Sequence, residues 1–448
     1  MTQQTLGALT NTGADSAPSV VPSLRELTAA SFKVGCLGFG GPAGQIALMH
    51  RIFVDEKKWI DEDRYAHALN YCMLLPGPEA QQLATYVGWL LHGVRGGIIA
   101  GGLFVLPGAV IVLMLSWLYV TAGQQPLVAA AFFGIKAAVF ALVAEAMIRI
   151  GKRALKGPAT WSIAVAAFLA LFAWSAPFPL VILAAGVVGA VLAKGRPLVG
   201  GQTIPGGESP GVRRALATAA AWTAAWLAPF LLSLGMLGPT HILTKVGQLF
   251  SVLAVVTFGG AYATLAYLKQ EAVDVEGWLT PGQMIDGLGL AETTPGPLVL
   301  VNEFVGYLAG WQGGAGGLLM AVLAAGMAAW CTFAPSFVWI FAGAPFAERL
   351  RTNRWANGVL QAITAAVLGV IANLAIWFAG HVLFGSFSDF RLPLQATIAL
   401  PRLESFDLAA GILCVAALLA LFRFRFGVLT LVLAAAASGV ALQLTGLV

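Results

Sequence analysis

Short runs of glycine and proline interrupt four hydrophobic segments of this chain. The runs are Phe39-Gly40-Gly41-Pro42, Pro76-Gly77-Pro78, Gly259-Gly260 and Pro295-Gly296-Pro297. Proline removes a backbone donor and glycine weakens a helix, so each run predicts the end of one helix and the start of the next. The expected helix starts are Pro42, Pro78, Ala261 and Pro297.

A helix start inside a membrane can bind an anion, because its first amides are unpaired and the helix dipole is positive there. Glycines beside such a start let an oxyanion approach the backbone closely. Several starts around one point would bind a tetrahedral dianion without an arginine. The alternative is that the prolines only kink the helices for packing. Four interruptions favour the binding site.

Ionisable residues at membrane depth are costly, which makes them candidates for function. Lys136 lies in the middle of segment 127–150, where its ammonium would either neutralise a substrate or form an internal salt bridge. Glu79 follows the first Pro-Gly-Pro run, Glu292 precedes the second and Glu303 follows it. A carboxylate beside an anion site is unfavourable unless it is protonated or paired, so these three residues are candidate proton carriers.

The sequence carries no motif of an enzyme or of an ATP-driven pump. A G-x-x-x-x-G-K-[ST] loop, an H-E-x-x-H helix and a nucleophile elbow are all absent. The histidines and the four cysteines have no metal-ligand spacing. We therefore expect no catalytic activity, no cofactor and no metal site.

The composition requires a lipid bilayer around most of the chain. Hydrophobic residues make up 59% of the 448 residues and charged residues only 10%, with a mean hydropathy of +0.84. A soluble domain is only about half apolar. The formal net charge of +5 comes from short basic clusters between hydrophobic segments, which set membrane orientation rather than bind nucleic acid. Residues 1–22 are polar and lack a secretory signal, which predicts a disordered cytoplasmic tail.

The chain contains an internal repeat. Three motifs recur 219 positions later: Phe39-Gly40-Gly41 as Phe258-Gly259-Gly260, Trp59 as Trp278, and Pro76-Gly77-Pro78 as Pro295-Gly296-Pro297. Two more recur 228 positions later: Pro107 as Pro335, and 135–139 as 363–367. Because tryptophan and Pro-Gly-Pro are rare, the constant register indicates a duplication with a short insertion in the second copy. The expected domains are a first repeat at 23–193, a basic linker with a linking helix at 194–240, and a second repeat at 241–448.

Nine hydrophobic segments are candidates for full membrane crossings, and four more are interrupted. The expected crossings are 95–120, 127–150, 159–175, 178–193, 215–235, 313–344, 355–384, 406–422 and 426–447. The interrupted segments are 24–53, 61–92, 241–271 and 280–310. Their pieces are mostly too short to cross, which favours re-entrant hairpins that return to their own side. Thirteen full crossings are the alternative.

The basic clusters favour hairpins, because cytoplasmic loops carry excess lysine and arginine. With hairpins, all five clusters lie on the cytoplasmic side, at 51–64, 149–156, 194–214, 349–354 and 423–425. In either topology the single crossing at 215–235 inverts the second repeat. The expected fold is an all-α polytopic membrane protein with two inverted-topology repeats and broken or re-entrant helices, a plan typical of secondary transporters with a midplane site.

Together these motifs resemble the chromate ion transporter family in its long, two-domain form. The resemblance covers about 24–445 and rests on Gly38 to Pro42, Lys57-Lys58-Trp59-Ile60, Leu75 to Pro78, Thr257 to Gly260 and Thr294 to Pro297. It implies an oxyanion substrate, chromate above all with sulfate as its isostere, and efflux that confers chromate resistance. The second copy departs from the first because Ala261 stands where the first copy has Pro42.

We therefore expect a secondary transporter that exports chromate across a bacterial cytoplasmic membrane. Its partners would be chromate or sulfate and the lipid bilayer, without nucleic acid, and a homodimer stays open. A dianion that leaves an inside-negative cell gains roughly 4.6 kcal/mol at 100 mV, so the membrane potential alone can drive export. The alternatives are a sulfate uptake carrier and an anion channel, and proton coupling stays open.

Overall fold

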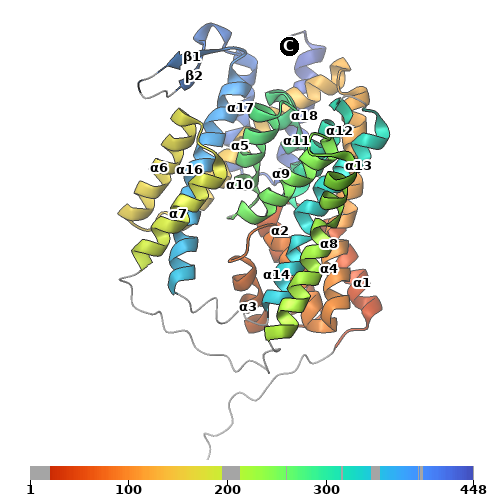
Figure 1. Ribbon diagram of the computed structural model, residues 1–448. Coiled ribbons are helices and arrows are strands. Elements are labelled where there is room, and N and C mark those ends of the chain that lie inside the picture. The colour runs from red at the N-terminus through yellow and green to blue at the C-terminus, as the bar shows by residue number, and fades with distance from the viewer. Residues whose placement is uncertain are drawn as a thin grey trace, which may run out of the picture.

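The computed structural model describes residues 21–193, 212–258, 260–313, 316–344, 354–391, 393 and 397–446. Predictions that fall outside these residues concern the tail at 1–20, Gly259, Lys194, Arg196, Arg349 and Arg351. The described chain is almost entirely helical (Figure 1). Among its helices, five are long and apolar enough to cross a membrane: Glu79–Ala122, Pro126–Ala154, Arg213–Leu237, Leu318–Gly343 and Trp355–Leu383. The prediction of an all-α polytopic membrane protein is confirmed.

The first repeat begins with interrupted helices and ends with longer ones. Its elements are α1 (Leu24–Leu37), α2 (Gly41–His50), the π-helix η1 (Arg51–Glu56), α3 (Glu62–Cys72), α4 (Glu79–Ala122), α5 (Pro126–Ala154), α6 (Pro158–Trp174) and α7 (Phe178–Ala193). Ser23 caps α1 in a capping box with Glu26, and Asp61 caps α3. The linking helix α8 (Val212–Leu237) follows.

The second repeat has the same order of helices. Its elements are α9 (Ile242–Val256), α10 (Ala261–Leu268), the π-helix η2 (Lys269–Val275), α11 (Pro281–Thr293), the 3₁₀-helix η3 (Leu298–Leu300), α12 (Val301–Gln312), α13 (Leu318–Phe333), α14 (Pro335–Gly343), α16 (Arg354–Leu383), β1 (Phe387–Arg391), β2 (Thr397–Pro401), the 3₁₀-helix η5 (Leu403–Ser405), α17 (Leu408–Phe422) and α18 (Val428–Leu444). The expected crossing at 313–344 corresponds to α13 and α14, which meet beside Pro335 and together form the apolar span Leu318–Gly343.

The interrupted segments return to the side of the bundle on which they start. In the second repeat, Lys245 in the first turn of α9 pairs with Glu276 just after η2, with 2.6 Å between Nζ and Oε2. In the first repeat, Lys57 just after η1 acts electrostatically on Glu26 in the first turn of α1, and Nε2 of His92, at the end of the second interrupted segment, lies 2.7 Å from Pro22 O. These segments are therefore hairpins, as the lengths of their pieces predict.

α4 consists of two helical arms joined by a sharp bend. His92 and Gly93 at the bend have non-helical backbone angles, and φ of Gly93 is 60°. Gly88 in the first arm packs against Gly96 in the second, so the two arms run antiparallel. The bend lies beside the start of α1, where His92 Nε2 is 2.7 Å from Pro22 O.

The second repeat makes the same hairpin with a longer loop. Gly306 of α12 packs against Ala324 of α13, as the two arms of α4 pack against each other. The chain needs residues 313–317 to connect α12 with α13, whereas α4 bends within two residues. This longer loop supplies part of the insertion that shifts the repeat from 219 to 228 positions.

A two-stranded antiparallel sheet lies where the sequence predicts only a loop between crossings. β1 pairs with β2 from Phe387 opposite Pro401 to Arg391 opposite Thr397. The corresponding connection of the first repeat, between α5 and α6, is only 155–157. Beyond the sheet, α17 and α18 are the equivalents of α6 and α7, with a larger offset.

The two repeats run in opposite directions. The second arm of α4 lies beside α13 and α14, its equivalents. A Cβ atom placed on Gly97 would lie 2.5 Å from Phe341, and one placed on Gly101 would lie 3.2 Å from Phe337. As the residue numbers rise along α4, the numbers of the residues that it contacts on α14 fall. The equivalent helices are therefore antiparallel. The inverted topology expected from the single linking helix is present.

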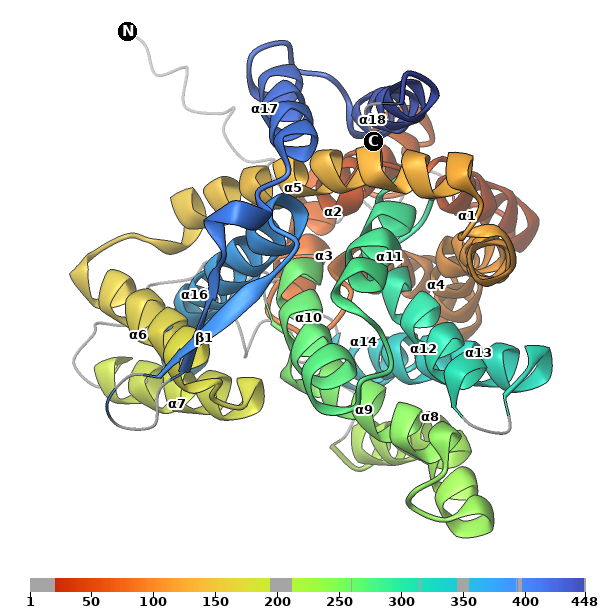
Figure 2. The same ribbon diagram turned by 90° about the horizontal axis from the view of Figure 1, so that it is seen from above.

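The last two helices of each repeat pack on the other repeat. α18 lies along α5, where Gly439 contacts Ala130 (Figure 2). α7 lies along α16, where Gly189 contacts Gly358. Gly439 is the equivalent of Gly189, and Ala130 is the equivalent of Gly358, so the exchange is symmetric. The repeats form one interlocked body, and the predicted domain boundaries near 193 and 240 stay predictions.

Candidate substrate site

The four helix breaks meet in pairs, each pair joining one repeat to the other. The amide of Gly77 donates to the carbonyl of Thr257 over 3.0 Å, and the amide of Gly296 donates to the carbonyl of Gly38 over 3.0 Å. Gly296 is the equivalent of Gly77, and Thr257 is the equivalent of Gly38. The two hydrogen bonds are therefore related by the internal two-fold symmetry of the fold.

A pocket lies where the four breaks meet. It has a volume of about 290 Å³, including the part that is open to the outside. Its lining comes from all four helix starts: Pro42, Gln45, Gly77, Pro78, Glu79, Ala80, Gly260, Ala261, Pro297, Leu298 and Val299. α10 begins at Ala261 although the proline is missing there, and α4 and η3 begin one residue after Pro78 and Pro297.

Glycine is required at the centre of both Pro-Gly-Pro runs. Gly77 has φ of 104° and Gly296 has φ of 100°, which other residues rarely adopt. This backbone turns each amide toward the other repeat and leaves the following helix start open to the pocket. The breaks are thus specific joints between repeats and do more than kink a helix.

Two glutamine side chains hold the breaks in place. Gln45 Nε2 donates to Gly38 O over 3.1 Å and to Gly296 O over 2.5 Å, which ties both repeats together. Gln82 Nε2 donates to Pro76 O over 2.7 Å. Both glutamines are fully buried. Gln45 was not among the residues predicted for the site, and its one signal in the sequence is that it is a polar residue one turn after a helix start in an apolar segment.

The structure brings six of the predicted site residues together around the pocket and leaves the others outside its lining. Those that line the pocket are Pro42, Gly77, Pro78, Gly260, Pro297 and Glu79. Those that lie in the breaks without lining it are Phe39, Gly40, Gly41, Pro76, Pro295 and Gly296. Lys136, Glu292 and Glu303 are outside the lining. The helix starts of the prediction converge, whereas the ionisable residues mostly surround them.

Lys136 forms an internal ion pair, which is one of the two alternatives that the sequence offered for it. Its Nζ lies 3.6 Å from Asp286 Oδ1 on α11, and Tyr119 donates from its hydroxyl to Asp286 Oδ2 over 2.9 Å. Asp286 is almost fully buried. The internal salt bridge that the sequence left open is therefore present. A buried ion pair of this kind needs such further hydrogen bonds to offset the loss of hydration.

Two of the three candidate proton carriers are buried close to the breaks in sequence. Tyr262 of α10 donates to Glu292 Oε1 over 2.8 Å, so this carboxylate joins α11 to the residue after Ala261 in the pocket. Glu303 is buried, and within the described residues its Oε2 has no hydrogen-bond partner. Glu79 itself lines the pocket.

The charged groups at the hairpin mouths lie away from the pocket. Hydrogen bonds from Ser23 lower the pKa of Glu26 below its usual value. A hydrogen bond with Glu62 raises the pKa of His50, and the nearby Asp55 adds to this effect. These groups lie at the surface, at the open ends of the hairpins, and do not belong to the pocket.

Two inverted repeats with broken helices that meet at a central pocket are an architecture typical of membrane transporters. The sequence profile described as Chromate transporter matches residues 25–190 and 244–440. A chromate transport protein of Pseudomonas aeruginosa is 32% identical over 81% of this chain and 83% of its own length. One from Cupriavidus metallidurans is 29% identical over 86% of this chain and 88% of its own length. No solved structure gives a significant match. The chain belongs to the chromate transporter family.

Proposed function

We propose that this chain is a secondary transporter that exports chromate across the bacterial cytoplasmic membrane and so confers chromate resistance. The observation that supports this most is the convergence of four helix starts from two inverted repeats on one pocket. The substrate is proposed from the printed names of the relatives in Pseudomonas aeruginosa and Cupriavidus metallidurans. A tetrahedral dianion suits a site made of backbone amides and positive dipole ends.

The amides available to the anion are those of the first helical turns. Gly77 and Gly296 use their amides to join the repeats, so they cannot donate to a substrate as well. The following residues Ala80 and Val299 line the pocket from α4 and η3. We assign these two helix starts as the main donors, with Pro42 and Gly260 marking the other two.

Export is the direction that the membrane potential favours for an anion. Lys152 and Arg153 lie in the last turn of α5, which returns to the side of the α4 bend, where the hairpins of the first repeat open. This side is cytoplasmic if the positive-inside rule holds. A dianion that leaves from there gains roughly 4.6 kcal/mol at 100 mV.

The test is flux of labelled chromate in proteoliposomes with an imposed potential. We expect saturable flux that follows the potential and is lost when Pro78 or Pro297 is replaced by alanine. Conductance without saturation in a planar bilayer would instead establish an anion channel. Chromate flux that is absent while sulfate moves inward would establish a sulfate uptake carrier.

The role of Lys136 can be separated from that of its ion pair. Lys136→Met leaves Asp286 unpaired, whereas Lys136→Met with Asp286→Asn removes both charges of the pair. If the ammonium acts on the substrate, the double variant folds like the parent but transports less. If Lys136 is only an internal partner, the double variant recovers transport.

Proton coupling is proposed for Glu79, Glu292 and Glu303 together. The Glu292 carboxylate and its partner Tyr262 are buried between α10 and α11, beside two pocket-forming breaks. We expect Glu292→Gln to remove the dependence of chromate flux on a pH gradient. Flux that never depends on the gradient in the parent protein would leave the membrane potential as the only driving force.

A further inference from the structure

The two repeats differ in how much of their hairpins is covered. Tyr262 and Ala263 of α10 are buried, whereas their equivalents on α2, Ala43 and Gly44, are exposed. The same holds for the second hairpin of each repeat. One face of α11 is buried, formed by Ile285, Leu288, Gly289 and Glu292. The equivalent face of α3 is more exposed, formed by Ala66, Leu69, Asn70 and Met73.

The long helices α5 and α16 cause this difference. α11 packs on α5, where a Cβ atom placed on Gly289 would lie 3.7 Å from Cβ of Ile135, and α10 packs on α16. Perfect symmetry would also pack α3 on α16 and α2 on α5. Among the described residues these two pairs do not pack to a comparable extent. The lower part of α16 stands apart from α3 (Figure 1).

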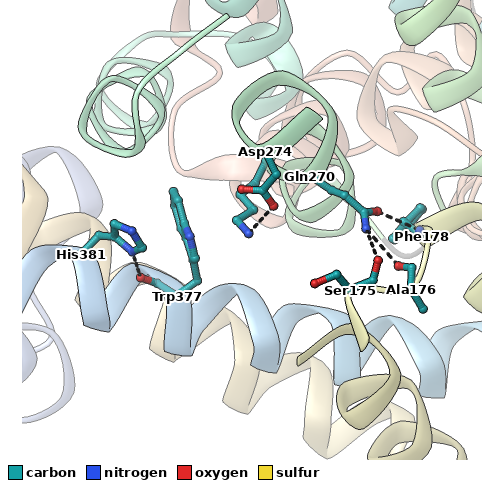
Figure 3. Close-up of polar contacts among 8 residues, drawn as sticks. Ser175, Ala176, Phe178, Gln270, Asp274, Trp377 and His381 are labelled. Atoms are coloured by element: carbon teal, nitrogen blue, oxygen red, sulfur yellow. Dashed lines mark hydrogen bonds and ion pairs between the residues drawn. The ribbon is translucent and has the colours of Figure 1, made fainter. Parts of the chain in front are cut away.

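Polar contacts close the covered side (Figure 3). Gln270 of η2 accepts from the amide of Phe178 over 2.9 Å and donates to Ala176 O over 3.0 Å. Lys269 lies over the ring of Trp377, 5.1 Å from its centroid. These contacts attach the mouth of the α9–α10 hairpin to the turn before α7 and to α16.

The equivalent positions on the other side carry basic side chains, each paired with a nearby carboxylate. His50 and Arg51 take the places of Lys269 and Gln270, and Arg149 takes the place of Trp377. The Arg149 side chain is 49% exposed. Arg149 pairs with Glu145 on its own helix, Arg51 pairs with Glu56, and His50 pairs with Asp55 and Glu62, so these groups bind local carboxylates and do not hold the two sides together.

Water rather than lipid must fill the uncovered side. Gly40 is exposed, and no atom lies within 4 Å of the position of a Cβ atom on Gly40 or Gly41. Non-helical backbone at membrane depth is tolerated only when it is buried in protein or lines a water-filled cavity. Arg153 lies at the edge of this uncovered side, with 3.1 Å between its Nη2 and Sδ of Met73 at the end of α3.

We infer that an anion reaches the pocket through a water-filled path between α2–α3 and α5, lined by Arg149 and Arg153, and that the opposite path opens when α2 and α3 take the contacts on α5 and α16 that α11 and α10 now hold. This inference rests on the proposed transport function. In the state that this structure represents, the pocket is open through the path beside Arg153 and closed on the opposite side.

Two cysteine pairs distinguish the two states. Ile135→Cys with Gly289→Cys places Cβ atoms about 3.7 Å apart in this structure, which suits a disulfide. The equivalent pair, Asn70→Cys with Ile363→Cys, should meet only in the opposite state. Both pairs are made in a chain whose four native cysteines are replaced by alanine, and Asn70→Cys with the lipid-facing Ile412→Cys is the control for random collision.

We expect both pairs to form disulfides separately, but not together in one molecule. A disulfide in the first pair should stop chromate flux until it is reduced, and it should prevent cross-linking in the second pair. The inference is overturned if the second pair never forms in a chain that transports, or if it forms equally well once the first pair is locked. Gel mobility and mass spectrometry detect the disulfides without chromate. If the two disulfides exclude each other but no chromate flux is found, the two-state inference stands and only the proposed substrate is wrong.

Discussion

Lys245 and Glu276 form an ion pair across the mouth of the α9–α10 hairpin, and the equivalent residues of the first repeat, Glu26 and Lys57, carry the opposite charges. The Lys57 ammonium acts on Glu26 electrostatically. Both repeats therefore close the base of their first hairpin with opposite charges, but with reversed polarity. The fold tolerates either polarity at this position.

Exchanging the charges of the second pair should therefore be tolerated. Glu276→Lys places two ammonium groups together and should lower the melting temperature in detergent, whereas Lys245→Glu with Glu276→Lys should restore it. Because both side chains are partly exposed, we expect a coupling of only about 0.2–1 kcal/mol from the double-mutant cycle. A double variant that is no more stable than the single one would show that the pair does not hold the hairpin.

The central glycines of the Pro-Gly-Pro runs should not tolerate any side chain. Gly77→Ala and Gly296→Ala each force alanine into a backbone with φ near 100°, at a cost of about 1–3 kcal/mol. Relief of this strain would break a hydrogen bond between the repeats, so we expect both variants to lower the saturable chromate flux measured in proteoliposomes.

The matched control for these variants is Gly102→Ala in α4. No atom lies within 4 Å of a Cβ atom at Gly102, and the residue is helical. Normal flux in this control together with normal flux in Gly77→Ala and Gly296→Ala would show that the joint between repeats is dispensable.

The sequence predicted the fold well because its helix-breaking motifs are rare and recur at a regular spacing. Pro-Gly-Pro and tryptophan in constant register revealed the duplication, and the segments matched the helices to within a few residues, as with α7 at Phe178–Ala193. The helix breaks followed from the chemistry of proline and glycine alone. These are local properties that a sequence states directly.

The relations between the repeats could not be predicted. Hydropathy shows that 178–193 and 428–444 are apolar, but not that each packs on the long helix of the other repeat. The ion pair between Lys136 and Asp286 could not be predicted, because the two residues are far apart in the chain. The exposure of α2 depends on where α5 and α16 stand in this state, which is a property of the conformation and not of the sequence.

Inversion places equivalent loops on opposite faces of the membrane. Glu56 and Val275 are equivalent and both exposed, one after each first hairpin. In a cysteine-free chain, an impermeant maleimide added to intact cells should label Val275→Cys, and it should label Glu56→Cys only after permeabilisation. Labelling of both from the same face would contradict the inverted arrangement.

His50 should make the entrance beside α3 sensitive to pH. Its Nε2 lies 2.6 Å from Glu62 Oε2, and this hydrogen bond raises the pKa of His50. A raised pKa in the folded state contributes stability that is full below the pKa of the unfolded chain and is lost as pH rises through the folded pKa. The melting-temperature difference between the parent and His50→Gln should therefore shrink from about pH 5 to about pH 8. A difference that persists unchanged in Glu62→Gln would assign the effect to another group.

The contact between α5 and α18 should be the part of the fold least able to accept added volume. A Cβ atom on Gly439 would collide with Ala130 O and lie 2.8 Å from the amide of Gly134. Gly439→Val should separate the two helices and destabilise the protein by about 1–3 kcal/mol, measured as a lower melting temperature in detergent. Gly189→Val should do the same at the equivalent contact, because the repeats exchange these helices symmetrically. Gly326→Val is the matched control, since Gly326 is exposed with no atom within 4 Å of a Cβ position. An equal loss in all three variants would show that valine harms these helices by itself, and that the close contact between repeats contributes little.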